Sequence, residues 1–241
     1  MASPTEDTIN SNPVRNIALL MLKKLFNCLD LIILLALGFL TRFWRLSYPP
    51  KVVFDETYFG LFATKYLSHQ YYFDIHPPLG KMLLGISAFF GNVKPEFDFA
   101  FGAHYGNINF LSLRFLPAFL GSLLILLVYL LVRELGFSKR VAFLASFMVL
   151  FDNAILVQSR LILMDIILVF FIFLSLHLFI VSKRFLLFSY KWYLSNVFLA
   201  ISLGVAISIK WTGFGVLGII WFLIIFQDRL LLSLKRERIV K

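Results

Sequence analysis

Long apolar segments alternate with short polar connections along most of this chain. A helix that crosses a bilayer needs roughly 20 apolar residues, with a lower limit near 17. Five segments reach or approach that length and a sixth is shorter; they cover residues 25–46, 110–132, 141–157, 161–181, 193–209 and 213–226. Lipid offers no hydrogen-bond partner to an open backbone, so each segment is expected to be helical. The pattern predicts an all-α, polytopic integral membrane protein with about six transmembrane helices.

The positions of Lys and Arg predict how these helices are oriented. Basic residues cluster in the N-terminal part, in every second connection and in the C-terminal tail, which is the distribution typical of cytoplasmic segments. We therefore expect a cytoplasmic tail over residues 1–24, a transmembrane domain over 25–226 and a basic cytoplasmic tail over 227–241. No secretory signal pattern opens the chain, so the first apolar run is expected to be a retained anchor.

The first outside connection, residues 47–109, differs from all the others in its length. It holds most of the acidic residues, namely Asp55, Glu56, Asp74, Glu96 and Asp98. Long loops of this kind commonly carry function. Two stretches in it are helix-like, residues 56–67 and residues 79–90. The second is apolar but too short to span and follows two prolines, which predicts an interfacial or re-entrant helix.

Composition supports a membrane protein and narrows the function classes. Of the 241 residues 60% are hydrophobic, and the mean hydropathy is +0.87. A soluble domain would be about half apolar. The formal charge of +10 follows the topology signal, so we expect no nucleic-acid partner. Cys28 is the only cysteine, which rules out an intrachain disulfide and a cysteine-based metal site.

Candidate chemistry lies first in the long loop. Asp55 and Glu56 are adjacent carboxylates at the end of an apolar run, where a partly desolvated carboxylate can act as a general base. Taken alone, the pair fits an ordinary helix start better, since acids favour the first turn. Asp74 and His76 precede Pro77-Pro78, so they either face a site at the membrane surface or cap the following helix.

Basic side chains at the outer ends of the apolar segments form a second candidate set: Arg42, Arg114, Arg160 and Lys210. Charges at membrane depth are costly and mark a function or a buried pair. Their gathering on one side favours an anion site, and a lipid-linked phosphate is an anion at that depth. Alternatively, each of these side chains extends along the helix so that its charge reaches the membrane interface. For Arg160, a structural ion pair with Asp165 is a further alternative.

These residues occur in an ordered set of motifs that resembles the protein O-mannosyltransferase family, the dolichyl-phosphate-mannose–protein mannosyltransferases of the GT-C fold. The most specific motif is Asp74-Ile75-His76-Pro77-Pro78-Leu79-Gly80-Lys81. The others are Val53-Phe54-Asp55-Glu56-Thr57-Tyr58, Leu113-Arg114-Phe115-Leu116-Pro117, Phe151-Asp152-Asn153, Gln158-Ser159-Arg160-Leu161-Ile162-Leu163-Met164-Asp165 and Ser208-Ile209-Lys210-Trp211.

The resemblance implies transfer of mannose from dolichyl (polyprenyl) phosphate mannose to Ser or Thr hydroxyls of an acceptor polypeptide, with inversion. Asp55 matches the family's catalytic carboxylate, and Glu56 matches its catalytic neighbour, which helps to position acceptor or donor. Asp74 and His76 match the second loop element, and Arg42 and Arg114 match basic residues expected to bind the carrier phosphate. No metal site is predicted, although Asp55 and Asp74 together could hold a divalent ion, as the first-loop carboxylates of some GT-C relatives do.

The chain also departs from the family pattern. Tyr58 and Asp152 replace residues common in eukaryotic members, and the spans are fewer than the family has. A fragment, a split-gene product and an inactive remnant are the open interpretations of this difference, and a dimer partner or a complementing C-terminal half is a candidate partner. A GT-C transferase for another polyprenyl-phosphate sugar and a non-catalytic membrane subunit stay open as alternatives. The expected location is the endoplasmic reticulum in a eukaryote and the plasma membrane in a prokaryote.

Overall fold

The structure is a computed structural model that describes the backbone of residues 29–239 and the side chains of residues 29–226. The expected tail at residues 1–24 and the first residues of the first apolar segment lie outside this range. Among residues 29–239 there is no β-strand, and the one isolated bridge joins Lys51 to His104. The expected all-α class is therefore confirmed for the described part of the chain.

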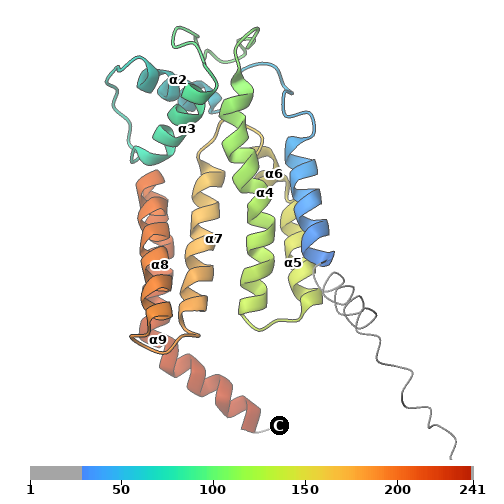
Figure 1. The fold of residues 1–241 in the computed structure, drawn as a ribbon, viewed down its shortest axis with the longest axis vertical. Helices are drawn as coiled ribbons and strands as arrows, with labels where there is room; N and C mark the ends of the chain where they lie inside the picture. Colours follow the sequence, from blue (N-terminus) through green and yellow to red (C-terminus); the bar gives the residue numbers. More distant parts are fainter. Residues whose placement is uncertain (1–28, 240–241) are drawn as a thin grey trace, which may run out of the picture.

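The molecule is a bundle of long helices with a two-helix cap at one end (Figure 1). The bundle comprises a helix at residues 29–43, α4 (Phe110–Glu134), α5 (Lys139–Phe151), α6 (Asn153–Gln158), α7 (Asp165–Ser182), α8 (Tyr190–Ile209) and α9 (Phe214–Ile239). The cap consists of α2 (Glu56–Leu67) and α3 (Leu79–Phe90), the two stretches that the sequence predicts to be helical. We call the end of the bundle that carries residues 47–109 the loop end.

Within the part of the chain that the structure describes, three helices are long and apolar enough to cross a membrane: α4, α7 and α8. The expected count of six spans is not established within the described residues. The apolar part of the last helix covers only Trp211–Phe226, and only 15 residues of the first helix, 29–43, are described. The placement of α3 at a membrane surface stays a prediction, because the structure contains no membrane.

The third apolar segment is not one helix, as the sequence pattern suggested, but two. The Asp152 backbone is extended, with φ −61° and ψ 121°, and its carboxylate accepts a hydrogen bond from Ile155 N at 2.9 Å. Aspartate is a strong N-cap because it satisfies a free amide in the first turn. Asp152 therefore ends α5 and starts α6 within the segment 141–157.

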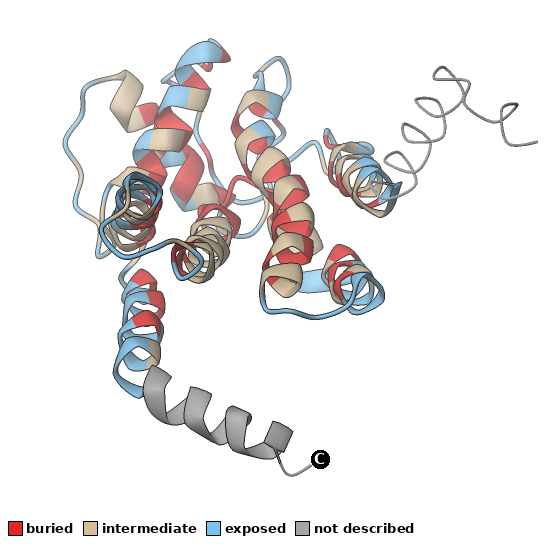
Figure 2. Ribbon diagram, turned by 60° about the horizontal axis from the view of Figure 1, so that its bottom comes forward, coloured by how far each residue is buried: buried red, intermediate tan, exposed pale blue. Residues whose placement is uncertain are grey.

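The helices bury one side each and leave apolar outer sides exposed (Figure 2). α7 packs against both α4 and α8, and a hydrogen bond between the Ser175 and Ser202 hydroxyls, 2.9 Å long, joins α7 to α8. Exposed residues such as Leu144, Phe198 and Ile201 would be costly in water. Their exposure is the arrangement expected where the helix surfaces face lipid.

The cap is fixed to the bundle by close packing at glycine and by aromatic rings. Gly60 of α2 faces the ring of Phe99, and a Cβ added there would come within 2.1 Å of that ring. Phe99 and Phe97 in turn pack edge to face, with centroids 4.9 Å apart, and Phe97 stacks on Tyr105. Tyr105 stacks on Phe110, the first residue of α4. The cap is thus held in a defined position over the helix ends.

Candidate active site

A fully buried ion pair connects the cap to the bundle. Glu56, the first residue of α2, and Arg114, in the second turn of α4, both have no exposed side-chain surface. The Arg114 Nε donates to Glu56 Oε1 at 2.8 Å and its Nη2 donates to Glu56 Oε2 at 3.0 Å. This bidentate geometry is the strongest form of an arginine–carboxylate contact.

Three further donors complete the environment of Glu56. The Tyr105 hydroxyl donates at 3.0 Å, Ile162 N at 3.0 Å and Val53 N at 3.1 Å. Burial, and next the charge of Glu56, raise the pKa of Tyr105, so its hydroxyl stays protonated and remains a donor. Sequence reasoning missed Tyr105, because no local pattern indicates that it lies against Glu56.

Arg114 is held by more than Glu56. Its Nη1 donates to the carbonyls of Leu46 at 3.1 Å and Pro49 at 3.0 Å, and its guanidinium lies over the rings of Tyr105 and Phe110. The guanidinium thus binds the start of the loop, the cap and α4 together. In this structure Arg114 is directed into the protein, whereas the sequence suggested a phosphate ligand.

Asp55 differs sharply from its neighbour Glu56. It is the residue before α2, and the backbone there turns at Phe54, whose φ is +52°. Its carbonyl accepts from the amides of Tyr58 and Phe59. Its carboxylate has no hydrogen bond or ion pair among the described side chains and is partly exposed. The Asp55 carboxylate is therefore available to a substrate while its backbone is fixed by the anchored Glu56.

Asp74 and His76 lie together through Lys81, the third residue of α3. The Lys81 ammonium is 2% exposed, forms an ion pair with Asp74 and donates to the carbonyl of His76 at 2.7 Å. Burial alone would raise the pKa of Asp74, but the hydrogen bond and charge of Lys81 and the amides of Ile75 and His76 lower it overall. Lys81 is the last residue of the Asp74–Lys81 motif, and the sequence alone did not indicate that it holds Asp74 and His76.

A cavity of about 350 Å³ opens beside this pair at the far end of α2. Its wall includes Tyr66, Tyr71, Tyr72, Phe73, Asp74 and His76. The Tyr72 hydroxyl and the His76 Nδ1 are buried and have no hydrogen-bond partner among the described residues. Buried polar atoms are rarely left without a partner, so these two atoms identify the cavity as a candidate binding site.

Arg42 and Arg160 meet at the loop end of the first helix. Arg42 is fully buried; its Nη1 donates to the Thr41 hydroxyl and to the Leu150 carbonyl, both at 2.8 Å, while its Nε and Nη2 have no partner within the described residues. Arg160 donates to the carbonyls of Thr41 and Arg45. Burial first, and then the charge of Arg114, lower the pKa of Arg160.

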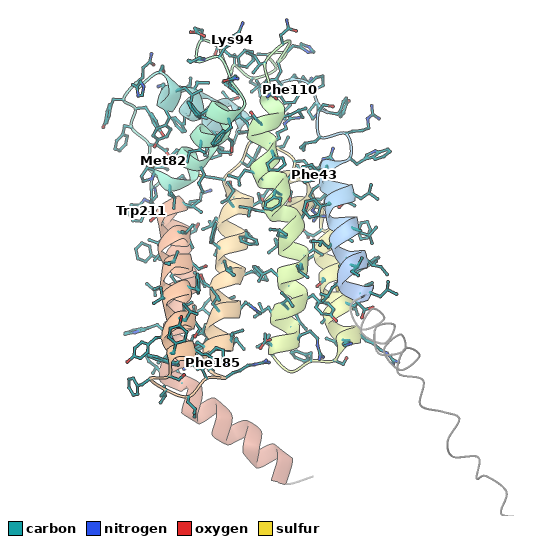
Figure 3. The ribbon with its side chains drawn as sticks, viewed as in Figure 1. Phe43, Met82, Lys94, Phe110, Phe185 and Trp211 are labelled. Carbon is teal, nitrogen blue, oxygen red and sulfur yellow. The ribbon has the colours of Figure 1, made fainter. Side chains whose placement is uncertain are left out.

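Lys210 follows α8 and forms an ion pair with Asp165, the first residue of α7, at 2.8 Å. Asp165 thus pairs with Lys210 rather than with Arg160, the structural pair that the sequence suggested. The next residue, Trp211, donates its indole Nε1–H to the carbonyl of Ile75 at 2.6 Å. Trp211 lies at the end of α8 nearest to Met82 of α3, opposite Phe185 (Figure 3).

All eight candidate residues lie at the loop end, but the structure does not gather them into one pocket. They form four groups: the buried pair Glu56–Arg114 with Asp55 beside it, Asp74 with His76, Arg42 with Arg160, and Lys210 with Asp165. In the described part of the chain, no three His, Cys, Asp or Glu side chains come together as a metal-binding group.

A helical membrane bundle capped by an acidic loop at one end is the architecture of the GT-C glycosyltransferases. The family model for dolichyl-phosphate-mannose-protein mannosyltransferases matches residues 32–241, and the chain belongs to this family. It is 39% identical to protein O-mannosyl-transferase 1 of Mus musculus over 77% of this chain and 26% of that protein. It is 36% identical to dolichyl-phosphate-mannose–protein mannosyltransferase 1 of Candida albicans over 80% of this chain and 22% of that protein.

Solved structures agree with this assignment. The chain superposes on the S. cerevisiae protein O-mannosyltransferase Pmt1-Pmt2 complex bound to the sugar donor, with a TM-score of 0.79 and 32% identity over 82% of this chain and 27% of that chain. An Archaeoglobus fulgidus oligosaccharyltransferase shares the fold, with a TM-score of 0.65 and 21% identity over 82% of this chain and 27% of that chain. The chain spans about a quarter of the length of these relatives.

Proposed function

We propose that this chain supplies the catalytic loop of an enzyme that transfers mannose from dolichyl phosphate mannose to Ser or Thr hydroxyls of proteins. The observation that carries the proposal is the contrast at Asp55 and Glu56. Glu56 is fully buried and accepts five hydrogen bonds, whereas the adjacent Asp55 carboxylate accepts none. An unpaired carboxylate on an anchored backbone is suited to act as a general base.

In this mechanism Asp55 takes the proton of the acceptor hydroxyl. The acceptor oxygen forms a bond to the anomeric carbon of mannose as the bond from that carbon to the carrier phosphate oxygen breaks. The electron pair leaves with the phosphate, and the anomeric configuration inverts. The chain's main tasks are deprotonation, orientation and stabilisation of the leaving phosphate.

The basic residues are proposed to stabilise that phosphate. Arg42 is the best-supported member, because its Nε and Nη2 are buried without a partner among the described residues, and a phosphate oxygen would satisfy both. Arg160, which lies beside it, and Lys210 add positive charge at the same end. Arg114 is proposed to act on the phosphate through its charge, since its donors already bind Glu56 and the loop.

Asp74 and His76 are proposed to bind substrate at the cavity beside α3. Partners are proposed from the relatives: one solved relative is a complex of two subunits, and this chain spans only about a quarter of its relatives. We therefore propose that transfer requires further chain, in the form of a complementing C-terminal half or a second subunit. The proposed setting is the endoplasmic reticulum membrane, with the loop end in the lumen and both termini in the cytoplasm.

The test is mannose transfer from a short-chain dolichyl phosphate mannose to a Ser/Thr peptide, with membranes that contain this chain and the complementing C-terminal half of a relative. We expect Asp55→Asn to lower the transfer rate about 100-fold or more, because a general base contributes at least that much. Asp98→Asn, which neutralises an exposed acid in the same loop, is the matched control and should leave the rate unchanged. Equal rates for Asp55→Asn and the parent would remove Asp55 as the base.

A further inference from the structure

The segment that leads into α3 has two different faces. Along residues 71–76 the side chains alternate: Tyr71, Phe73 and Ile75 are 88%, 79% and 70% exposed, while Tyr72, Asp74 and His76 are partly buried. All three members of the partly buried set line the cavity at the far end of α2, and so do the exposed Tyr71 and Phe73. The segment therefore brings a buried hydroxyl, a carboxylate and an imidazole to the cavity together with two aromatic rings.

The ring of Tyr72 is fixed, although its hydroxyl makes no hydrogen bond of ordinary geometry within the described residues and has the Tyr66 side chain close to it. It stacks on Phe62 with centroids 4.5 Å apart and packs edge to face with Tyr66 at 5.5 Å. The Lys81 ammonium lies 5.9 Å from its centroid. The hydroxyl is therefore held in one place, as is the nearby His76, whose carbonyl accepts from Lys81. Burial raises the pKa of Tyr72, so the group is a neutral hydroxyl that can both donate and accept.

The chemistry of the cavity selects a neutral ligand. The one carboxylate in its wall, Asp74, is already paired with Lys81, so the two charges cancel. The remaining unpaired atoms, the Tyr72 hydroxyl and the His76 Nδ1, need partners that donate or accept hydrogen bonds without bearing charge. The other lining residues are uncharged, namely the aromatic Tyr66, Tyr71 and Phe73 with Gln70 and Pro78. Hydroxyl groups on a compact ring with apolar C–H faces meet all three requirements.

We propose that this cavity is a binding subsite for a neutral hexosyl group. Its volume of about 350 Å³ lies at the lower end of the range for small-molecule pockets. Tyr66 stands 11 residues after Asp55, which places it roughly 16 Å away along the axis of α2 at about 1.5 Å per residue. A sugar in the cavity is therefore separate from the one transferred at Asp55. This makes it a sugar already carried by the acceptor polypeptide, an assignment that rests on the proposed function.

Binding can be measured without any transfer. The probe is methyl α-mannoside, added to the purified 241-residue chain in detergent and followed by saturation-transfer NMR. We expect saturable binding that Tyr72→Phe weakens about fivefold, the effect of one lost neutral hydrogen bond. Tyr190→Phe removes the same atom from a residue that is 78% exposed at the other end of the bundle, and should bind as the parent does. His76→Phe tests the second polar atom and should also weaken binding.

Two further probes separate the sources of the sugar. A peptide with a mannosylated Ser should compete with methyl α-mannoside for the cavity, and short-chain dolichyl phosphate mannose should compete only weakly. Stronger competition by the lipid-linked sugar, no saturable binding of any probe, or equal binding by the parent, Tyr72→Phe and His76→Phe would each overturn the proposal. Because no transfer is involved, loss of activity in Asp55→Asn leaves this result unaffected, and the two proposals fail separately.

Discussion

Two polar regions at the loop end of the bundle are built in opposite ways. Around Glu56, every carboxylate lone-pair direction faces a donor from Arg114, Tyr105 or the backbone, and nothing is left for a ligand. Around Tyr72 and His76, polar atoms are buried without partners beside an open cavity. The difference separates groups that hold the loop in place from groups that we propose bind a substrate, although Glu56 and His76 both lie in motifs of the family.

The largest expected effect on stability comes from removing Arg114, which supplies two of the five hydrogen bonds to the buried Glu56 carboxylate. Arg114→Met would leave the Glu56 carboxylate buried without its counter-charge, which costs about 3–5 kcal/mol. The measurement is the free energy of unfolding from SDS titration in mixed micelles. Arg133→Met, the same change in the last turn of the same helix, removes only a partly exposed hydrogen bond and should cost less than about 1 kcal/mol. Similar losses of unfolding free energy in Arg114→Met and Arg133→Met would show that the contacts of Arg114 with Glu56 do not hold the loop in place.

A smaller effect on stability is expected at Asp74, whose ion pair with Lys81 forms part of the wall of the cavity beside Tyr72 and His76. Asp74→Asn leaves Lys81, only 2% exposed, without its counter-charge and should cost about 2 kcal/mol at neutral pH. The pKa of Asp74 is lower in the folded state than its ordinary value of 3.8. The contribution of the pair is therefore full above about pH 4 and is lost as the pH falls through the lower, folded-state pKa.

The corresponding measurement is the melting temperature of the parent and of Asp74→Asn as the pH is lowered from 7 to 3. The difference between the two proteins should begin to shrink below about pH 4, where the unfolded parent takes up a proton that the folded ion pair resists. A difference that stays constant over the whole range would show that the ion pair does not stabilise the cavity wall.

The smallest effect is expected at the ion pair between Lys210 and Asp165. Their side chains are 22% and 29% exposed, so solvent screens the attraction. Lys210→Met should lower the free energy of unfolding by only about 0.5 kcal/mol. A loss of unfolding free energy close to that of Arg114→Met would mean that the Lys210–Asp165 pair stabilises the fold as strongly as the buried Glu56–Arg114 pair does.

Local patterns were sufficient to predict much of the fold. The bounds of α2 and α3 follow from short runs of helix-forming residues that begin after Asp55 and after Pro77-Pro78. The break at Asp152 was also a local signal, an N-cap residue within an apolar run, but the length of that run concealed it. Hydrophobic periodicity alone could not distinguish one helix from two here.

The partners within the candidate site were beyond sequence reasoning. Glu56 and Arg114 are 58 residues apart and Tyr105 is 49 residues from Glu56, so only the folded chain brings them together. The sequence indicated that charges gather at one end, which the structure bears out. It did not indicate that Arg114 is committed to Glu56, that Asp165 pairs with Lys210, or that Tyr72 and His76 are left unpaired.

The hydrogen bond from the Trp211 indole to the Ile75 carbonyl has a mechanical consequence. Ile75 lies between two residues of the cavity wall, and Trp211 is separated from the end of α8 by Lys210 alone. A movement of α8 along its axis would therefore shift Ile75 and, with it, the neighbouring residues of the cavity wall. The position of the cavity wall therefore depends on the position of α8 relative to the cap.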